Sequence, residues 1–88
     1  MAKKKVTFML GAEQKAKQVK LAGNFTGWEQ GAIVMKHARS GEWKADVSLE
    51  PGEYEYKFIA DGNWVNDPQA DAQKANAQGI TNSVKFVR

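Results

Sequence analysis

The sequence lacks cysteine entirely and contains a single histidine among its 88 residues. Disulfides and thiolate metal sites are therefore excluded, and because a reducing compartment is the natural environment of such a chain, we expect a cytoplasmic protein. The histidine, His37, falls in an expected exposed turn and has no cue to a serine or aspartate partner. The sequence also has no glycine-rich phosphate loop and no metal-ligand spacing. We expect no metal, no cofactor and no catalytic residue, and hence no enzymatic activity of the chain alone.

Acidic residues offer one catalytic alternative, because glycosidases use two carboxylates held across a cleft. Asp61, Asp67 and Asp71 are candidates by residue type, but a turn or a loop explains each of them equally well. A domain of this size also leaves little room for the enclosed cleft that cleavage of a glycosidic bond requires. We therefore do not expect glycosidase activity.

Long hydrophobic runs and a strong excess of one charge are also missing. No segment approaches the roughly 20 apolar residues of a membrane span, and residues 6–10 are too short a run for a signal peptide, so no membrane partner is expected. The net charge is +3, and three positive charges belong to Lys3, Lys4 and Lys5. Residues 1–5 are expected to form a basic tail, and residues 6–88 a single, nearly neutral domain. Because a nucleic-acid binder would carry a basic stripe on its folded body, nucleic acid is not an expected partner.

Apolar and polar residues alternate in short segments, and no helical period is present. The expected strands are 6–10, 19–23, 33–35, 43–49, 52–60 and 80–88, and the segment around Trp64 is expected to pair back on residues 52–60. About seven short strands at such spacing predict an all-β, antiparallel sandwich of immunoglobulin-like type. Trp43, Val84 and Phe86 are in phase with the apolar residues of their strands and are expected in the core. Pro51-Gly52 predicts a type II turn, and residues 69–79 a surface loop.

The rest of the domain is organised around residues 52–68. The first half of this segment alternates aromatic with mostly charged residues, so that one face is aromatic and Lys57 lies on the other. Asp61-Gly62 predicts a tight reversal, because glycine tolerates positive φ and aspartate can satisfy its own backbone. Pro68 ends the pairing, since proline has no N–H. Trp64 is therefore expected at the outer end of a hairpin, near Lys57.

Two tryptophans, Trp28 and Trp64, lie in irregular segments shortly after glycines rather than in a strand period. We expect both to be exposed, and exposed large aromatic side chains usually bind something. An indole ring stacks on the C–H face of a glucopyranose ring, which buries apolar area. Lys57 and the amides of the last loop would supply hydrogen bonds to hydroxyl groups at the edge of the sugar. These residues predict a sugar-binding surface.

Four motifs carry a resemblance to a known family: the segments 23–28, 52–64 and 66–68, and Asn82. The match runs in order from about Lys17 to Val87, and its most specific part is Tyr-Lys-Phe-x-x-Asp-Gly-x-Trp followed by Asp-Pro. The chain resembles the glycogen-binding domain of AMP-activated protein kinase β subunits. It is equally similar to the N-terminal early-set modules of isoamylases and glycogen branching enzymes, grouped as carbohydrate-binding module family 48.

The resemblance implies an early-set, immunoglobulin-like sandwich that binds α-1,4-glucans such as glycogen, starch or maltooligosaccharides without cleaving them. In the family two tryptophans flank the glucose chain, and they correspond to Trp28 and Trp64. The lysine of the Tyr-Lys-Phe motif and the asparagine of the last loop, here Lys57 and Asn82, hydrogen-bond sugar hydroxyls.

Three positions depart from the family pattern. Thr26 stands where the first motif usually has asparagine, so the loop is expected to present Trp28 differently. In the loop that clasps the glucan, kinase-type members read Leu-Gly-Thr-x-Asn, and here Gln78 and Ile80 replace the leucine and the threonine. Gln78 and Ile80 are therefore candidate binding residues. Because they replace the leucine and the threonine, we expect the affinity for glucan to differ from that of kinase-type members.

Some family members inside enzymes keep the fold and lose the sugar site. The alternative function is therefore a protein-interaction or packing module of a glycogen- or starch-metabolising enzyme or kinase, in which Trp28 and Trp64 contact protein instead of sugar. In that case the chain would be an accessory module, or an excised part, of a glycoside hydrolase, branching enzyme or kinase. Retention on an immobilised glucan distinguishes the two functions.

Overall fold

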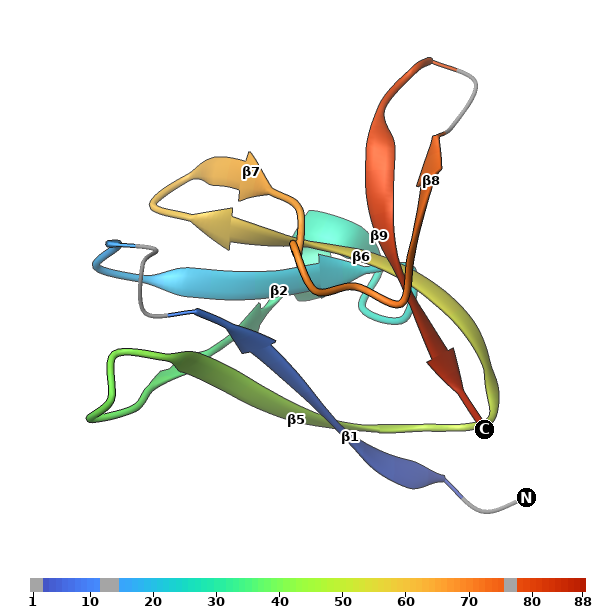
Figure 1. Cartoon of the computed structure of the whole chain (residues 1–88), viewed down its shortest axis with the longest axis horizontal. Helices are drawn as coiled ribbons and strands as arrows, with labels where there is room; N and C mark the ends of the chain where they lie inside the picture. The colour runs from blue at the N-terminus through green and yellow to red at the C-terminus, as the bar shows by residue number, and fades with distance from the viewer. Residues whose placement is uncertain (1–2, 12–14, 76–77) are drawn as a thin grey trace.

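The computed structural model describes residues 3–11, 15–75 and 78–88, and nearly all of the regular structure in them is β-strand (Figure 1). The elements are β1 (Lys4–Leu10), β2 (Val19–Gly23), the short 3-10 helix η1 (Trp28–Gly31), β3 (Ile33–Val34), β4 (Lys36–His37), β5 (Trp43–Leu49), β6 (Gly52–Ala60), β7 (Asn63–Val65), β8 (Ala72–Ala75) and β9 (Thr81–Val87). All strand pairs are antiparallel. None of the helices in the described residues is long and apolar enough to span a membrane.

The strands form two sheets, which confirms the predicted antiparallel sandwich. The smaller sheet has the order β1-β5-β4, and the larger has the order β3-β2-β6-β9-β8, with β7 paired to β6. Figure 1 shows β1 and β5 on one side of the molecule and the β2, β6 and β9 layer on the other. The chain changes sheets at Met35, between β3 and β4, where we had expected a single strand over residues 33–35. The nine-residue strand β6 lies in the middle of the larger sheet.

Alternation of apolar and polar residues places the core between the two sheets. Its buried members are Val6, Phe8, Leu10, Val19, Leu21, Met35, Trp43, Ala45, Leu49, Tyr56, Phe58, Ala60 and Val87. Aromatic rings from both sheets meet there, for example Phe8 and Tyr56 in an edge-to-face arrangement with ring centroids 4.8 Å apart. Because Tyr56 and Phe58 point into this core, Lys57 between them points to the outer face of the larger sheet.

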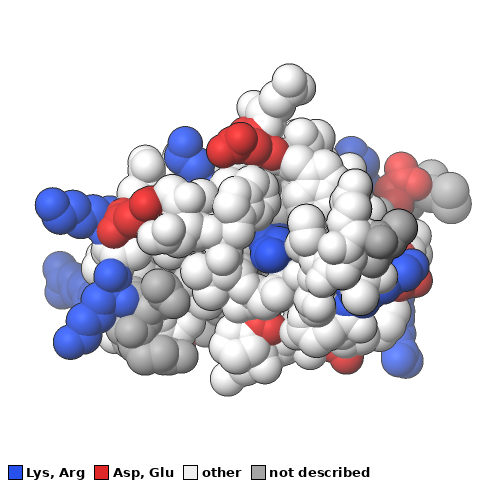
Figure 2. Space-filling view, turned by 90° about the horizontal axis from the view of Figure 1, so that it is seen from above, with Lys and Arg blue, Asp and Glu red and all other residues white. Residues whose placement is uncertain are grey.

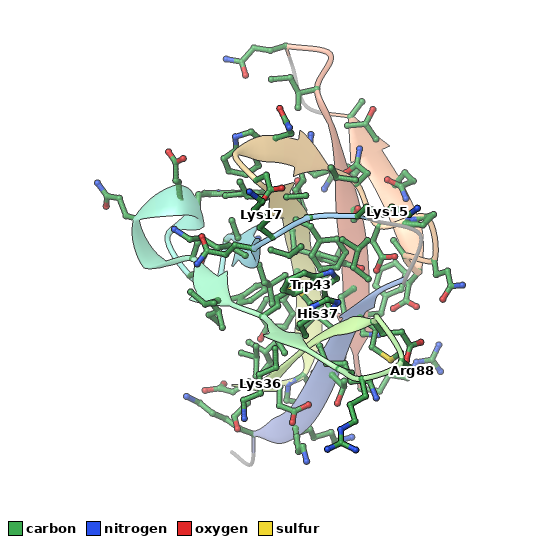
Figure 3. The ribbon with its side chains drawn as sticks, turned by 90° about the vertical axis from the view of Figure 1, so that its left-hand side faces the viewer. Lys15, Lys17, Lys36, His37, Trp43 and Arg88 are labelled. Carbon is green, nitrogen blue, oxygen red and sulfur yellow. The ribbon has the colours of Figure 1, made fainter. Side chains whose placement is uncertain are left out.

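Trp43 lies in the core as predicted, with 3% of its surface exposed. His37 belongs to β4 rather than to the expected turn, and its exposed imidazole stacks on the Trp43 ring with centroids 4.1 Å apart (Figure 3). Backbone pairing between β4 and β5 aligns His37 with Trp43. The histidine therefore covers one edge of the core.

The Asp61-Gly62 reversal is confirmed, because both residues have positive φ (49° and 86°), as a two-residue hairpin turn requires. The aspartate does not satisfy its own backbone, however: its carboxylate accepts the backbone N–H groups of Lys17 and Gln18 at 3.0–3.1 Å. The predicted type II turn at Pro51-Gly52 is wrong. Gly52 has φ 158° and begins β6, whereas a type II turn needs about +80° at that position.

Phe86 was expected in the core and is instead 46% exposed. In β9 the inward side is that of Ser83, which pairs in register with Tyr56, Lys85, whose ammonium lies over the Phe8 ring, and Val87, so Phe86 faces outward. Ser83 takes an inward position because its hydroxyl is bonded to Asn66 and to the backbone of Asp67. Val84 is buried as expected, but it lies outside the core between the sheets.

Part of the surface loop expected over residues 69–79 is strand β8, which pairs with β9. Its side chains are mostly exposed, so its stability comes from the backbone ladder and not from an apolar face that sequence periodicity would reveal. Residues 76–77 of the expected loop lie outside the described residues. At the other end, β1 begins at Lys4, so that Lys4 and Lys5 of the expected tail are strand residues, and residues 1–2 also lie outside the described part.

Candidate functional site

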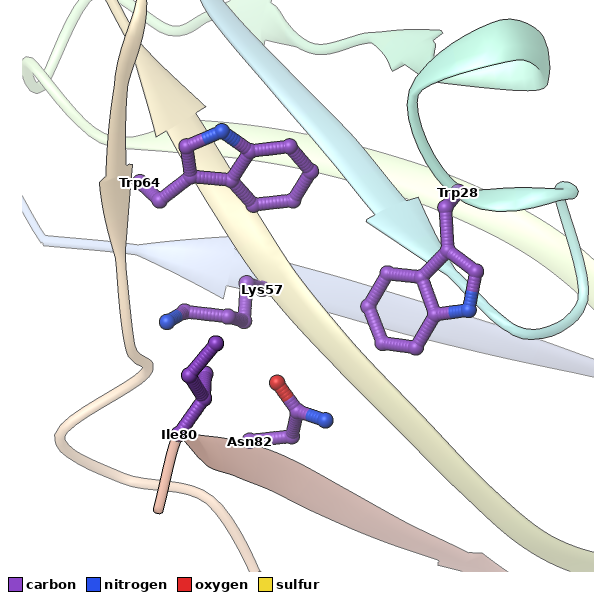
Figure 4. A pocket seen from close by; sticks show the side chains of 5 residues that line it. All are labelled: Trp28, Lys57, Trp64, Ile80 and Asn82. Carbon is purple, nitrogen blue, oxygen red and sulfur yellow. The ribbon is translucent and has the colours of Figure 1, made fainter. Parts of the chain in front are cut away.

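An open cavity of about 520 Å³ lies on the outer face of the larger sheet, lined by Trp28, Lys57, Trp64, Ile80 and Asn82 (Figure 4). Five of the six residues singled out from the sequence are thus brought together from three strands, the 3-10 helix η1 and the loop before β9. The sixth, Gln78, is exposed and is not among the described residues that line the cavity. Viewed from above, this face is largely uncharged, with a basic side chain near its middle and most charged side chains near its edges (Figure 2).

The β6–β7 hairpin positions Trp64 and Lys57. Trp64 pairs in register with Ile59, two residues after Lys57 on the same outer face of β6. The indole is 43% exposed, so a large apolar surface is open to solvent. In Figure 4 the Lys57 side chain lies between Trp64 and Ile80. The hairpin therefore holds a flat apolar ring beside a hydrogen-bond donor.

A tight turn at the start of η1 presents Trp28, which is half-buried and not exposed as expected. Gly27 and Trp28 both have left-handed backbone conformations, with φ of 74° and 61°. This conformation is unusual for a bulky residue and costs on the order of 1–3 kcal/mol, so the surrounding loop must hold it. A Cβ at Gly31 would collide with the carbonyl oxygen of Thr26, which explains the glycine at that position.

Thr26, the departure from the family motif, organises this loop through its hydroxyl group. Its Oγ1 accepts the N–H of Gly23 at 3.1 Å and lies within donating distance of the carbonyl oxygens of Gly23 (3.0 Å) and Trp28 (2.9 Å). A hydroxyl is suited to this place because it both donates and accepts. Thr26 thus fixes the backbone of the residue whose ring lines the cavity.

The start of β9 supplies the amide of the site. Asn82 is only 7% exposed, and its Nδ2 donates to Oε1 of Glu55 at 3.1 Å. Ile80, two residues earlier, is 49% exposed at the rim of the cavity. Asn82 therefore offers a fixed polar group at the cavity wall, and Ile80 adds apolar surface where kinase-type members have threonine.

A largely buried hydrogen-bond network holds together the segments that flank the site. The hydroxyl of Tyr56 donates to Asp67 at 2.6 Å, and the N–H of Asp67 donates to Oγ of Ser83 at 2.8 Å. Asn66 accepts from Ser83 at 3.0 Å and donates to the carbonyl of Thr81 at 2.9 Å. Burial, together with the bond to the Asp67 carboxylate, raises the pKa of Tyr56 far above its ordinary value. The network connects the segment after Trp64 to the start of β9.

The groups that line the cavity are suited to binding a ligand through apolar contact and hydrogen bonds. Two indole rings offer apolar faces, the ammonium of Lys57 donates hydrogen bonds, and the amide of Asn82 has both donor and acceptor atoms. None of the five lining residues is acidic. In the part of the chain that the structure describes, no group of three or more His, Asp or Glu side chains is placed to hold a metal ion.

Glu55 was not singled out from the sequence. The alternation along residues 52–60 does place it on the same face as Lys57, so a signal for its position existed. Its bond to Asn82 could not be foreseen, because it joins side chains 27 residues apart.

Comparisons with known proteins identify the family to which the chain belongs. The family model for the glycogen recognition site of AMP-activated protein kinase matches residues 6–88. The chain is 45% identical over 53 residues to Protein PTST homolog 2, chloroplastic, of Arabidopsis thaliana, covering 60% of this chain and 10% of that protein. It is 29% identical over 69 residues to the 5'-AMP-activated protein kinase subunit beta-1 of Sus scrofa, covering 78% of this chain and 54% of that sequence.

Among solved structures, the chain is similar to a putative alpha amylase from Salmonella typhimurium, with a TM-score of 0.68 and 30% identity over 99% of this chain and 13% of that one. The chain thus spans only 10% of the plant relative and about half of the pig sequence. Because the family model covers nearly the whole chain, this chain belongs to the family of glycogen recognition domains of AMP-activated protein kinase.

Proposed function

We propose that this chain binds α-1,4-glucans, such as glycogen, starch or maltooligosaccharides, without cleaving them. The observation that carries the proposal is the convergence of Trp28, Trp64, Lys57 and Asn82 on one open cavity. Membership of a glycogen-recognition family supports the same ligand class.

Stacking supplies the main attraction in this proposal. The C–H face of each glucose unit lies against an indole ring, and the area that leaves water provides most of the binding free energy. Lys57 and Asn82 then bind the hydroxyl groups at the edge of the sugar. Since the cavity is open rather than enclosed, a glucan chain crosses it without needing a free end. Short sugars therefore bind weakly, and long or branched glucans gain affinity by engaging several copies of the domain.

Binding without cleavage is supported by the residues around the cavity. Glycosidases need two carboxyl groups at a defined separation, and the lining contains neither aspartate nor glutamate. The chain also matches only parts of its longer relatives. In this proposal the domain brings a glycogen- or starch-metabolising enzyme or kinase to its polysaccharide, in a reducing compartment such as the cytoplasm.

The competing function is a packing or interaction module that no longer binds sugar. It is favoured by one observation, which is that the matched region is a minor part of the plant relative and of the solved neighbour. The exposed Trp64 and Ile80 would then contact protein.

Electrophoresis in native gels containing glycogen tests the proposal. The wild-type chain should be retarded, and Trp64→Ala should lose at least about tenfold in affinity, or about 1.4 kcal/mol. Phe86→Ala is the matched control, because Phe86 is exposed to a similar extent (46% against 43%) and does not line the cavity. A wild-type chain that migrates unretarded, or equal retardation of Trp64→Ala and wild type, would refute glucan binding at this site.

A further inference from the structure

Glu55 is hydrogen-bonded to two segments that contribute residues to the cavity. It lies on β6 two residues before Lys57, on the same outer face, and its side chain is half-buried. Its Oε1 accepts the Nδ2–H of Asn82 at 3.1 Å, which is a bond between neighbouring strands of the larger sheet. Its backbone N–H donates to Oδ1 of Asn24 at 3.3 Å, and its carbonyl accepts the N–H of Asn24 at 3.0 Å. Glu55 thus joins the loop that carries Trp28 to the strand that carries Asn82.

The Glu55 bond determines which way the Asn82 amide faces. An ionised carboxylate only accepts hydrogen bonds, so the NH₂ group of Asn82 must be the end that meets Glu55. The amide oxygen is then left for the cavity, and Figure 4 shows it turned to the side on which Lys57 lies. Because Asn82 is 7% exposed, it has little freedom to rotate once this bond is formed. The polar part of the site therefore includes a donor, Lys57, and an acceptor, Oδ1 of Asn82.

We propose that Glu55 is a positioning residue that fixes Asn82 as a hydrogen-bond acceptor, so that the site selects two neighbouring hydroxyl groups of a sugar. One hydroxyl accepts a hydrogen bond from Lys57, and the other donates its own to Asn82. Such a pair of adjacent hydroxyls lies along one edge of each glucose unit. This inference rests on the proposed glucan binding. It adds the residue that makes Asn82 an acceptor of hydrogen bonds from the sugar.

A double-mutant cycle tests whether Glu55 acts through Asn82. Binding of maltoheptaose is measured by titration calorimetry for the wild type, Glu55→Ala, Asn82→Ala and the double variant. We expect Glu55→Ala to weaken binding about fivefold in the wild-type background and by less than about 1.5-fold when Asn82 is already alanine. Equal losses in both backgrounds would overturn the proposal, because Glu55 would then act on the sugar directly or through the fold.

Glu53→Ala is the matched control. Glu53 is exposed, lies on the same face of β6 and carries the same charge, but its register partner is Phe86, away from the cavity. Binding within about twofold of the wild type is expected, because only a screened surface charge is lost. A loss as large as that of Glu55→Ala would show that charge, and not the bond to Asn82, causes the effect.

The side-chain NH₂ resonances of Asn82 give a second readout that needs no sugar. Glu55→Ala should shift this pair in a ¹H–¹⁵N spectrum, and Glu55→Gln should keep it closer to the wild-type position, because the glutamine carbonyl still accepts. Unchanged resonances in Glu55→Ala would overturn the positioning role even if glucan binds. Conversely, shifted resonances in a chain that binds no glucan would refute the proposed function and leave the Glu55–Asn82 bond established.

Discussion

The hydroxyl of Tyr56 donates a 2.6 Å hydrogen bond to the carboxylate of Asp67, and both side chains are buried. Tyr56 belongs to the middle strand of the larger sheet, whereas Asp67 follows the hairpin that carries Trp64. The bond therefore fastens the segment after Trp64 to the core. The Asn-Asp-Pro motif, noted first as the end of a strand pairing, is a structural support for the site.

Removing this hydroxyl should destabilise the fold measurably. In Tyr56→Phe the buried carboxylate of Asp67 loses a short bond, so we expect the free energy of unfolding to fall by about 1–3 kcal/mol. Tyr54→Phe is the matched control, because its hydroxyl donates to the carbonyl of Glu50 in an exposed region, and it should cost less than about 1 kcal/mol. Urea unfolding followed by tryptophan fluorescence measures both values. Equal losses in the two variants would contradict the role of the buried network.

Alkaline pH should weaken the fold through the same tyrosine. The pKa of Tyr56 is raised above its ordinary value of 10.0, so above that pH the unfolded chain releases a proton that the folded chain keeps. The stabilisation is complete below pH 10 and is lost as the pH rises, by up to about 1.4 kcal/mol per unit. Urea midpoints measured between about pH 9 and 11.5 should therefore fall more steeply for the wild type than for Tyr56→Phe. Parallel curves would show that Tyr56 does not keep its proton in the folded state.

The hydroxyl of Thr26 should be required for the presentation of Trp28. Thr26→Val has nearly the same shape but leaves the N–H of Gly23 without its partner, so we expect a loss of about 1–3 kcal/mol in stability and a several-fold loss of glucan affinity. Thr26→Ser keeps the hydroxyl and should retain binding within about twofold. Unfolding and maltoheptaose titration of both variants test this. If Thr26→Val binds as well as Thr26→Ser, the hydroxyl does not position the ring.

Sequence reasoning succeeded where side-chain pattern and turn chemistry determine the structure. The alternation along residues 52–60 predicted the core strand, and Asp61-Gly62 predicted the hairpin that exposes Trp64. The predicted neighbourhood of Trp64 and Lys57 is observed, and Trp28 and Asn82 line the same cavity. The roles of these residues in binding remain predictions.

Three of the failures have a common physical origin, which is that long-range contacts overrode the local pattern. Ser83 faces inward because it bonds to Asn66 and Asp67, and this places Phe86 on the surface. Strand β8 has no apolar face and is held by its ladder to β9. Asp61 caps backbone groups of a segment more than 40 residues away. None of these contacts leaves a periodic signal in the sequence.

The most direct test of glucan binding at this cavity is a ¹H–¹⁵N NMR titration of the chain with maltoheptaose. The chain has three tryptophans and therefore three indole N–H signals. We predict that those of Trp28 and Trp64 shift, together with backbone amides around Lys57 and Asn82, while the signal of the buried Trp43 stays in place. Absence of shifts at millimolar sugar, or shifts confined to the His37–Trp43 side of the molecule, would contradict the account and direct the search to a protein partner.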